Sequence, residues 1–361
     1  MARIFNFGAG PATMPLSVLE KARDQFVDFR GKGMALLEMS HRGKEYEEVH
    51  RQAMRLVAEL LGLPGNYKVL FLGGGATLQF GMVPLNFLAP GRAADYTLTG
   101  SWAKKALADA GKVGKVNVVF DGTPDGFMSL PEPREVQTTP GAAYLHLTSN
   151  ETIGGVQWPS FPDTGEVPLI VDMSSDFLSR RLPVERFGLI YAGAQKNLGP
   201  AGVTVVVLRE DLLARCNPNL PAYLNYRNHW DGDSLYNTPP AFAVWMVALT
   251  LEWLRDLGGL EAAEKLADER AGMIYGVIDA SGGFYRSPVK PACRSKMNVV
   301  FRLPGDDLEK RFLEEALKNG LNGLKGHRSV GGCRASLYNA MPVAGARALA
   351  ELMMDFARRH G

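Results

Sequence analysis

The feature that most constrains this chain is a lysine placed between two strongly apolar runs, residues 187–192 and 203–208. The second run, Val-Thr-Val-Val-Val-Leu, is almost wholly β-branched, which is typical of a strand covered on both faces. The stretch between the runs contains Lys196 and several small residues that let backbone or ligand approach closely: Gly193, Ala194, Gly199, Ala201 and Gly202. We therefore expect two buried strands with Lys196 in the segment that joins them.

Two interpretations of Lys196 are open at this point. No carboxylate lies within residues 191–202 to hold an ammonium group. A desolvated lysine loses its proton more readily and becomes a nucleophilic amine. Such an amine suits Schiff-base chemistry, for which pyridoxal phosphate is the commonest carbonyl partner. The alternative is an exposed lysine in a glycine-rich turn, because most lysines are exposed.

Length, charge and cysteine content narrow the class of protein. The 361 residues are enough for a large core and about two domains. Lys and Arg total 40 and Asp and Glu total 38, so the formal net charge is only +2. A charge this small predicts no general electrostatic attraction to nucleic acid or to an anionic membrane. Three scattered cysteines do not form a disulfide framework or a zinc motif. The N-terminus lacks the apolar core of a signal peptide, so we expect a cytoplasmic protein.

Predicted strands alternate with helices over the first 260 residues. Strands are expected at 68–72, 95–98, 116–120, 143–147 and 169–172, and helices at 18–29, 46–61, 78–88 and 241–254. This alternation predicts an α/β fold with a mostly parallel sheet. A turn at Gly258-Gly259 precedes a mixture of helices and one strand, so we expect an N-terminal arm (1–15), a large domain (16–260) and a small α+β domain (261–361).

Polar and aromatic side chains follow several of the predicted strands. Ligands of parallel sheets bind beyond the carboxyl ends of the strands. Trp102, Thr152 and Asp172 each stand near such an end. Taken singly they fit a core tryptophan, a turn residue and a helix cap. Because the strand ends meet at one edge together with Lys196, they predict a site.

A glycine-rich turn, Gly73-Gly-Gly-Ala-Thr77, joins the predicted strand 68–72 to a helix. Such a turn presents free backbone N–H groups and the positive end of a helix dipole, which suits a phosphate. The same turn also serves simply as a tight connection. It does not match a dinucleotide-binding fingerprint, because Leu78 stands where the third glycine would be.

Two groups of cations lie in predicted loops. His41 and Arg42 precede the helix 46–61, where the helix dipole slightly disfavours positive charge. The glycine-rich loop 326–336 holds the densest cluster: His327, Arg328 and Arg334. Arginine side chains bind carboxylate and phosphate in a bidentate manner, whereas the alternative is an exposed basic loop. Thr238 is expected to cap the helix 241–254, with Pro239 at its first position.

Seven segments spread over nearly the whole chain resemble the phosphoserine aminotransferase family, which belongs to class V and fold type I of the pyridoxal-phosphate enzymes. The segments are FNFGAGPATMP, SHRGKEY, GGGATLQF, SNETIGG, YAGAQKNLGPAG, LYNTPP and GHRSVGGCRASLYNAMP. The resemblance implies a mostly parallel seven-stranded sheet, a small C-terminal domain and a homodimer with shared active sites. It also implies a reversible transamination in serine biosynthesis, in which phosphoserine and 2-oxoglutarate give 3-phosphohydroxypyruvate and glutamate.

The resemblance also implies roles for single residues. Lys196 would bind pyridoxal phosphate as a Schiff base, Asp172 would pair with the pyridinium nitrogen, and Trp102 would stack on the ring. Other cofactor contacts are implied for Ala76, Thr77, Thr152, Gln195 and, from the partner subunit, Asn237 and Thr238. Substrate contacts are implied for His41, Arg42, His327, Arg328 and Arg334. No metal is expected.

One departure and several alternatives accompany this resemblance. Some family members have Gly-Arg where this chain has Ala76-Thr77, so the cofactor phosphate would depend here on backbone and hydroxyl donors. A serine/alanine–glyoxylate transaminase is the nearest alternative, although its small substrates need fewer cations. A cysteine desulfurase needs a reactive cysteine, and only Cys333 lies near the motifs. The alternative from another class is a non-catalytic nucleotide-binding protein. The resemblance leaves open whether 4-phosphohydroxythreonine, in vitamin B6 synthesis, is also a substrate.

Overall fold

The computed structural model describes residues 3–361 and contains a seven-stranded sheet of order β2-β10-β9-β8-β5-β3-β4. Its strands are β2 (Tyr67–Leu72), β3 (Ala93–Leu98), β4 (Lys115–Asp121), β5 (Leu145–Thr148), β8 (Leu169–Asp172), β9 (Phe187–Gly193) and β10 (Thr204–Arg209). Within this sheet, only the pairings of β10 with β2 and β9 are antiparallel. The predicted α/β fold with a mostly parallel seven-stranded sheet is confirmed.

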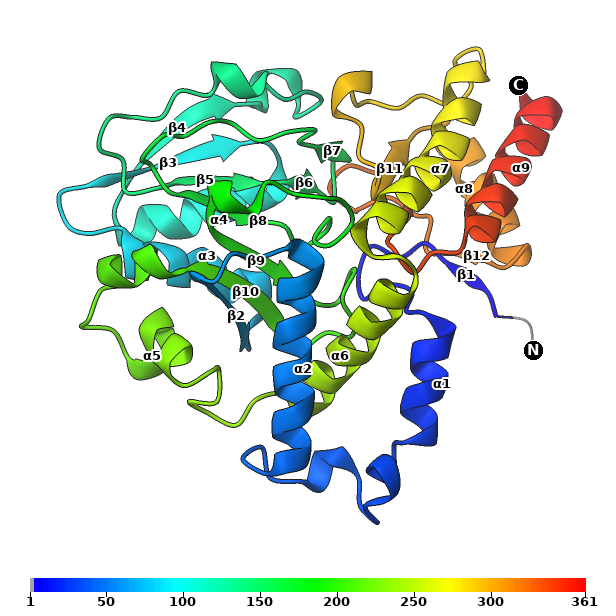
Figure 1. Ribbon diagram of the computed structural model, residues 1–361. Helices are drawn as coiled ribbons and strands as arrows, with labels where there is room; N and C mark the ends of the chain where they lie inside the picture. The colour runs from blue at the N-terminus through cyan, green and yellow to red at the C-terminus, as the bar shows by residue number, and fades with distance from the viewer. Residues whose placement is uncertain (1–2) are drawn as a thin grey trace.

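Helices cover both faces of this sheet because alternate strand residues point to opposite sides. Along β2, Val69 and Phe71 enter a core with α2 (Lys44–Leu61) and α6 (Ala241–Asp256). Leu70 and Leu72 enter the opposite core with α3 (Gly75–Phe87) and α4 (Ser101–Val113). Figure 1 shows α2 and α6 side by side, with the shorter α1 (Leu16–Asp24) next to α6. The central strands are therefore buried on both faces, as their apolar runs predict.

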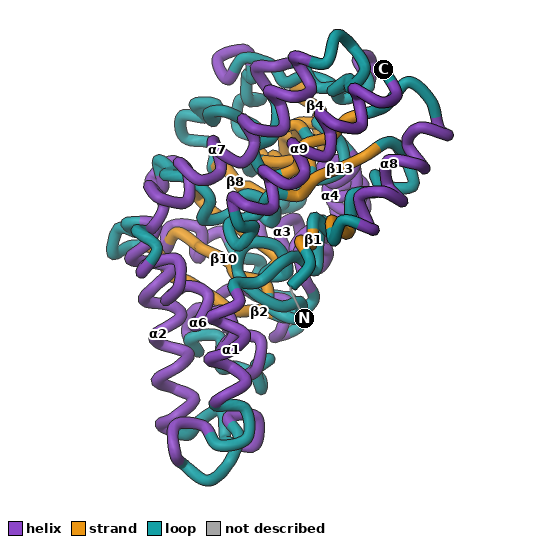
Figure 2. Tube along the Cα trace, turned by 90° about the vertical axis from the view of Figure 1, so that its right-hand side faces the viewer, coloured by secondary structure: helices purple, strands orange, loops and turns teal. Residues whose placement is uncertain are grey.

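The C-terminal portion has a core of its own. It contains α7 (Gly259–Ala280), β11 (Asn298–Phe301), α8 (Asp306–Lys318), β12 (Leu321–Asn322), β13 (Cys333–Ser336) and α9 (Val343–His360). β11 pairs with β13, and β1 (Phe5–Asn6), near the N-terminus, pairs with β12, so Phe7 enters this second core. Figure 2 shows α7, α8 and α9 gathered at the end of the molecule away from α1 and α2. The domain bounds 1–15, 16–260 and 261–361 stay a prediction.

A hairpin links these two portions near the sheet edge. Its strands are β6 (Asn150–Glu151) and β7 (Val156–Gln157), and Gly155 in its turn has a φ of +76°. A Cβ on Gly155 would overlap the side chain of Val300 and lie 2.9 Å from the carbonyl oxygen of Asn298, both on β11. The absence of a side chain therefore lets the hairpin pack directly against the C-terminal portion.

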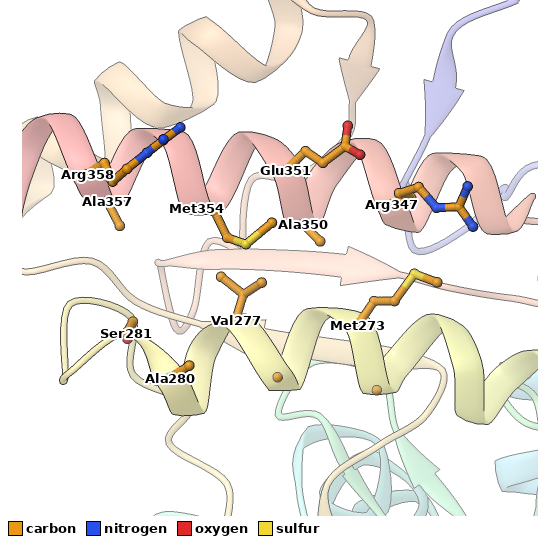
Figure 3. Close-up of a pocket in the computed structure, with 12 residues that line it drawn as sticks. Met273, Val277, Ala280, Ser281, Arg347, Ala350, Glu351, Met354, Ala357 and Arg358 are labelled. Carbon is orange, nitrogen blue, oxygen red and sulfur yellow. The ribbon is translucent and has the colours of Figure 1, made fainter.

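An apolar groove lies on the other side of the C-terminal portion, between α7 and α9. In Figure 3, Met354 of α9 points toward Val277 of α7, and charged side chains such as Glu351 and Arg358 stand at the rim. None of the side chains predicted to bind cofactor or substrate lines this groove. It is therefore separate from the site that the sequence predicts.

Two local features differ clearly from the sequence prediction. The helix expected over 18–29 ends at Asp24, and Phe29 lies instead in a 3₁₀ turn, edge-on to the Trp245 ring at 5.7 Å between centroids. Thr238 does not cap α6, which begins at Ala241, because Pro239 precedes a second proline and is kept out of the helical conformation.

No helix within residues 3–361 combines the length and the apolar character that crossing a membrane requires.

Candidate active site

A pocket opens at the carboxyl edge of the parallel strands. It is lined by residues that end or follow the strands β2, β3, β5, β8 and β9: Gly75, Ala76, Thr77, Trp102, Thr148, Asn150, Thr152, Asp172, Ser174, Ser175, Gln195 and Lys196. Seven of them are among the predicted cofactor contacts: Ala76, Thr77, Trp102, Thr152, Asp172, Gln195 and Lys196. The structure thus brings together side chains that lie up to 120 residues apart in sequence.

Lys196 follows β9 and projects into this pocket. Its Nζ donates a hydrogen bond of 2.7 Å to Thr152 Oγ1 and lies 5.7 Å from the centroid of the Trp102 ring. Burial lowers the pKa of the Lys196 ammonium to about 8, although the carboxylates of Asp172 and Glu151 oppose this shift. About a tenth of Lys196 is therefore a neutral, nucleophilic amine at pH 7, and about half at pH 8.

Asp172 ends β8 and is buried at the base of the pocket. One oxygen, Oδ1, accepts a hydrogen bond of 2.9 Å from the backbone N–H of Ser174. Desolvation raises the pKa of Asp172, while hydrogen bonds from Ser174 and the charge of Lys196 oppose the shift. A buried carboxylate of this kind can hold a protonated ring nitrogen by a charge-assisted hydrogen bond.

Glu151 is a further buried acid, which the sequence reasoning missed. Only 1% of its surface is exposed, and its carboxylate accepts hydrogen bonds from the backbone N–H groups of Trp102 (3.1 Å) and Ala103 (2.8 Å). Desolvation raises the pKa of Glu151 to about 7, against the opposing effect of these two donors. Its position in SNET resembles a turn residue, and no local signal identifies partners on α4, 48 and 49 residues away.

The chemistry of the lining residues fits pyridoxal phosphate. At the start of α3, the first backbone N–H groups have no partner within the helix, and they face the pocket beside the hydroxyl of Thr77, as a phosphate requires. Gly74 has a φ of +82°, and a Cβ there would lie 2.6 Å from Leu78. Trp102 Nε1 and Thr148 Oγ1 are buried and have no hydrogen-bond partner among residues 3–361. The pocket thus offers a phosphate cradle, an aromatic face, an acid and an amine.

The predicted cations are only partly gathered here. Arg334 on β13 donates from Nη1 to the carbonyl oxygen of Thr152 at 3.1 Å, which places it beside the pocket. His327 and Arg328 line a separate surface hollow next to α8. Burial and the charges of Arg334, Arg328 and Lys105 lower the pKa of His327, so these cations lie within electrostatic reach of one another.

Four other predicted contacts do not line the pocket of their own chain. His41 and Arg42 occupy the turn before α2, and Asn237 and Thr238 are exposed in the segment before α6. The sequence reasoning gave no role to four further lining residues, Thr148, Asn150, Ser174 and Ser175, whereas Gly75 belongs to the glycine-rich turn that was expected to suit a phosphate. Each of these residues lies at the end of a strand or just after it. Many residues outside any site have the same position, so it could not identify them.

Comparison with known proteins identifies the class. Residues 4–349 match the family model "Aminotransferase class-V". The chain belongs to this family of aminotransferases.

Individual relatives are more specific. A phosphoserine aminotransferase from Laribacter hongkongensis is 53% identical over 358 residues, which cover 99% of each chain. The solved phosphoserine aminotransferase of Bacillus circulans subsp. alkalophilus has a TM-score of 0.98 and 52% identity, with 99% of each chain covered. A phosphoserine aminotransferase from Trichomonas vaginalis, solved with bound pyridoxal phosphate, has a TM-score of 0.92 and 39% identity, over 98% of this chain and 100% of that one.

The lowered pKa of Lys196 can be tested directly. The neutral amine reacts with an acylating reagent, so the modification rate of Lys196 in the cofactor-free chain should rise with pH through a midpoint near 8. Asp172→Asn removes a negative charge that stabilises the ammonium, and the midpoint should then move to lower pH. Mass spectrometry of the Lys196 peptide measures the rate. The exposed Asp163→Asn variant is the matched control and should leave the midpoint unchanged. A wild-type midpoint near the ordinary lysine value of 10.5 would contradict the desolvation of Lys196.

Proposed function

We propose that this chain is a pyridoxal-phosphate-dependent phosphoserine aminotransferase of serine biosynthesis. It would reversibly transfer the amino group of phosphoserine to 2-oxoglutarate, and the products would be 3-phosphohydroxypyruvate and glutamate. The observation that carries the proposal is the convergence of a desolvated lysine and a buried aspartate on one pocket. The chain that holds this pocket is 53% identical, over 99% of its length, to a phosphoserine aminotransferase.

Each residue of the pocket has a distinct task in this proposal. Bound pyridoxal phosphate supplies a carbonyl that takes up the amino group and a ring that takes up electrons. Asp172 would hold the ring nitrogen, Trp102 would cover one face of the ring, and the Thr77 hydroxyl with the first N–H groups of α3 would hold the phosphate. Ala76, Thr152 and Gln195 complete the enclosure. Lys196 Nζ, as a neutral amine, would accept the proton of the substrate Cα and return it in the reverse direction.

The distal anion of the substrate explains the number of cations. Phosphoserine carries a phosphate and glutamate carries a second carboxylate, and each needs donors beyond those for the α-carboxylate. Arg334 would bind the α-carboxylate, and its contact with the carbonyl oxygen of Thr152, beside the pocket, supports this role. His41, Arg42, His327 and Arg328 remain for the distal group. The serine/alanine–glyoxylate alternative leaves these four cations without a task.

Cysteine desulfurase chemistry does not fit the structure. Cys333 is fully buried on β13, and burial raises the pKa of its thiol far above the ordinary value. A buried thiol with a raised pKa is a poor nucleophile. Cys216, Cys293 and Cys333 all lie unpaired, which supports our proposal of a reducing, cytoplasmic location.

A homodimer with shared sites is part of the proposal. Asn237 and Thr238 are exposed and away from the pocket of their own chain, so they are free to reach the phosphate in a partner's pocket. Large apolar side chains are exposed over residues 16–37, as expected for a covered surface: Leu16, Leu19, Phe26, Val27, Met34 and Leu37. Light scattering should give twice the chain mass of 39.3 kDa, whereas a monomer that is fully active would contradict this arrangement.

Replacement of Lys196 tests the proposed activity. The wild-type chain should form glutamate from 2-oxoglutarate and phosphoserine, and borohydride should fix the cofactor to Lys196. Lys196→Ala should abolish both, because no other amine holds that position, while far-UV circular dichroism stays unchanged. Lys112→Ala, on the exposed face of α4, is the control and should be fully active. Borohydride fixation at another lysine with near-normal turnover would refute the assignment.

The same assay separates competing substrates. Serine and alanine with glyoxylate should react poorly, and activity with them above that with phosphoserine would favour the alternative transaminase. The same assay with 4-phosphohydroxythreonine tests whether this compound is also a substrate. A purified chain that binds nucleotide and no pyridoxal phosphate would support the non-catalytic alternative.

The cations can be distinguished by their tasks. Arg334→Ala should lower the specificity constants for phosphoserine, glutamate and alanine alike, by about tenfold to a hundredfold, because one charge-assisted hydrogen bond to the common carboxylate is lost. Arg42→Ala should lower those for phosphoserine and glutamate and spare the weak activity on alanine. Arg358→Ala, exposed at the end of α9, is the control. Equal losses for alanine and phosphoserine in Arg42→Ala would show that Arg42 does not contact the distal group.

A further inference from the structure

The buried acid Glu151 joins two neighbouring elements, each of which carries a residue of the pocket: Trp102 on α4 and Thr152 beside β6. It belongs to the short hairpin strand β6, and its carboxylate accepts hydrogen bonds from the first turn of α4. The next residue, Thr152, accepts the hydrogen bond from Lys196 Nζ. Consecutive residues of one hairpin therefore hold the helix that carries Trp102 and the side chain of Lys196.

The first turn of α4 has no cap of its own. Gly100 precedes the helix and has no side chain to accept a hydrogen bond, and no acidic residue lies in the first turn. Lys104 and Lys105 follow at once, where positive charge opposes the helix dipole. Glu151 supplies the missing acceptors from a distant part of the chain, as a capping side chain would.

Gly100 provides the space for this carboxylate. A Cβ at Gly100 would overlap the carboxyl carbon of Glu151 and would lie 2.7 Å from its Cγ and Oε2 atoms. The carboxylate itself is buried against the start of α4, with 1% of Glu151 exposed. Any side chain at position 100 would therefore displace the carboxylate from the two N–H groups.

We propose that Glu151 is a positioning residue: by holding the first turn of α4, it sets the distance between the Trp102 ring and Lys196 and so the width of the slot that receives the cofactor ring. That distance is 5.7 Å from Lys196 Nζ to the ring centroid. The inference rests on the proposed function, because it assigns the slot to pyridoxal phosphate. Glu151 acts through Trp102 and needs no contact with the cofactor.

Two variants perturb the contact in different ways. Glu151→Gln keeps the size of the side chain, removes its charge and presents an amide N–H to one of the two donors. Gly100→Ala keeps the carboxylate and pushes it away from the helix. Titration of the cofactor-free full chain with pyridoxal phosphate, followed by the visible absorption of the bound cofactor, gives the dissociation constant. We expect each variant to raise it about tenfold, as for the loss of one charge-assisted hydrogen bond.

A double-mutant cycle separates positioning from a general loss of structure. In a Trp102→Ala background no aromatic ring is left to position, so Glu151→Gln should change the dissociation constant by less than about twofold. Asp95→Asn is the matched control: Asp95 is also fully buried, and it accepts hydrogen bonds from the Thr139 N–H and the Asn117 side chain, away from α4. It should lower the melting temperature and leave the dissociation constant unchanged.

The outcomes distinguish this inference from the proposed function. Wild-type affinity in both Glu151→Gln and Gly100→Ala would overturn the positioning role alone. An equal loss from Glu151→Gln with Trp102 intact and in the Trp102→Ala background would overturn it as well, because Glu151 would then act independently of the ring. A wild-type chain that does not bind pyridoxal phosphate would overturn the proposed function together with the inference.

Discussion

The candidate site depends most on the burial of three ionisable groups, Lys196, Asp172 and Glu151, at one edge of the sheet. Burial penalises the charged form of each, and it lowers the pKa of the amine while it raises the pKa values of the two acids. A cluster of this kind persists only where donors and acceptors surround it, because unpaired buried charges cost several kcal/mol. Thr152, Ser174 and the first turn of α4 supply those partners. The same desolvation makes the lysine a nucleophile near neutral pH.

Much of the fold could be predicted because its strands carry a strong local signal. Runs such as 203–208 are apolar and β-branched, and the alternation of strands and helices determines a mostly parallel sheet. The two errors have different sources. Phe29 leaves the predicted helix for the ring of Trp245, and local patterns contain no information about such a tertiary contact. The failure of Thr238 to cap α6 is a local effect that was overlooked, because the second of two consecutive prolines keeps Pro239 out of the helix.

The residues of the candidate site also differ in how far they could be predicted from the sequence. Asp172, Trp102 and Lys196 could be predicted together because parallel strands end at a common edge, and the family resemblance assigned a role to each. Glu151 could not, since its function depends on backbone donors 48 and 49 residues away and on the missing side chain of Gly100. His41, Arg42, Asn237 and Thr238 are a different case. Their residue types fit anion binding, but one chain does not bring them to the pocket, so their roles stay proposals that require a partner.

The hairpin 149–157 connects these observations, because successive residues contact different parts of the molecule. Ser149 donates to the carbonyl oxygen of Asp172, Asn150 donates to Ser175 and to Asn298 of β11, and Thr152 accepts from Lys196. The carbonyl oxygen of Thr152 accepts from Arg334, which belongs to the C-terminal portion. A displacement of the C-terminal portion would therefore act on the hairpin through Asn298 and Arg334, and reach Lys196 through Thr152. In the proposed function Arg334 would also bind the substrate carboxylate, and the same side chain would then contact both the substrate and the backbone of Thr152, whose hydroxyl accepts from Lys196.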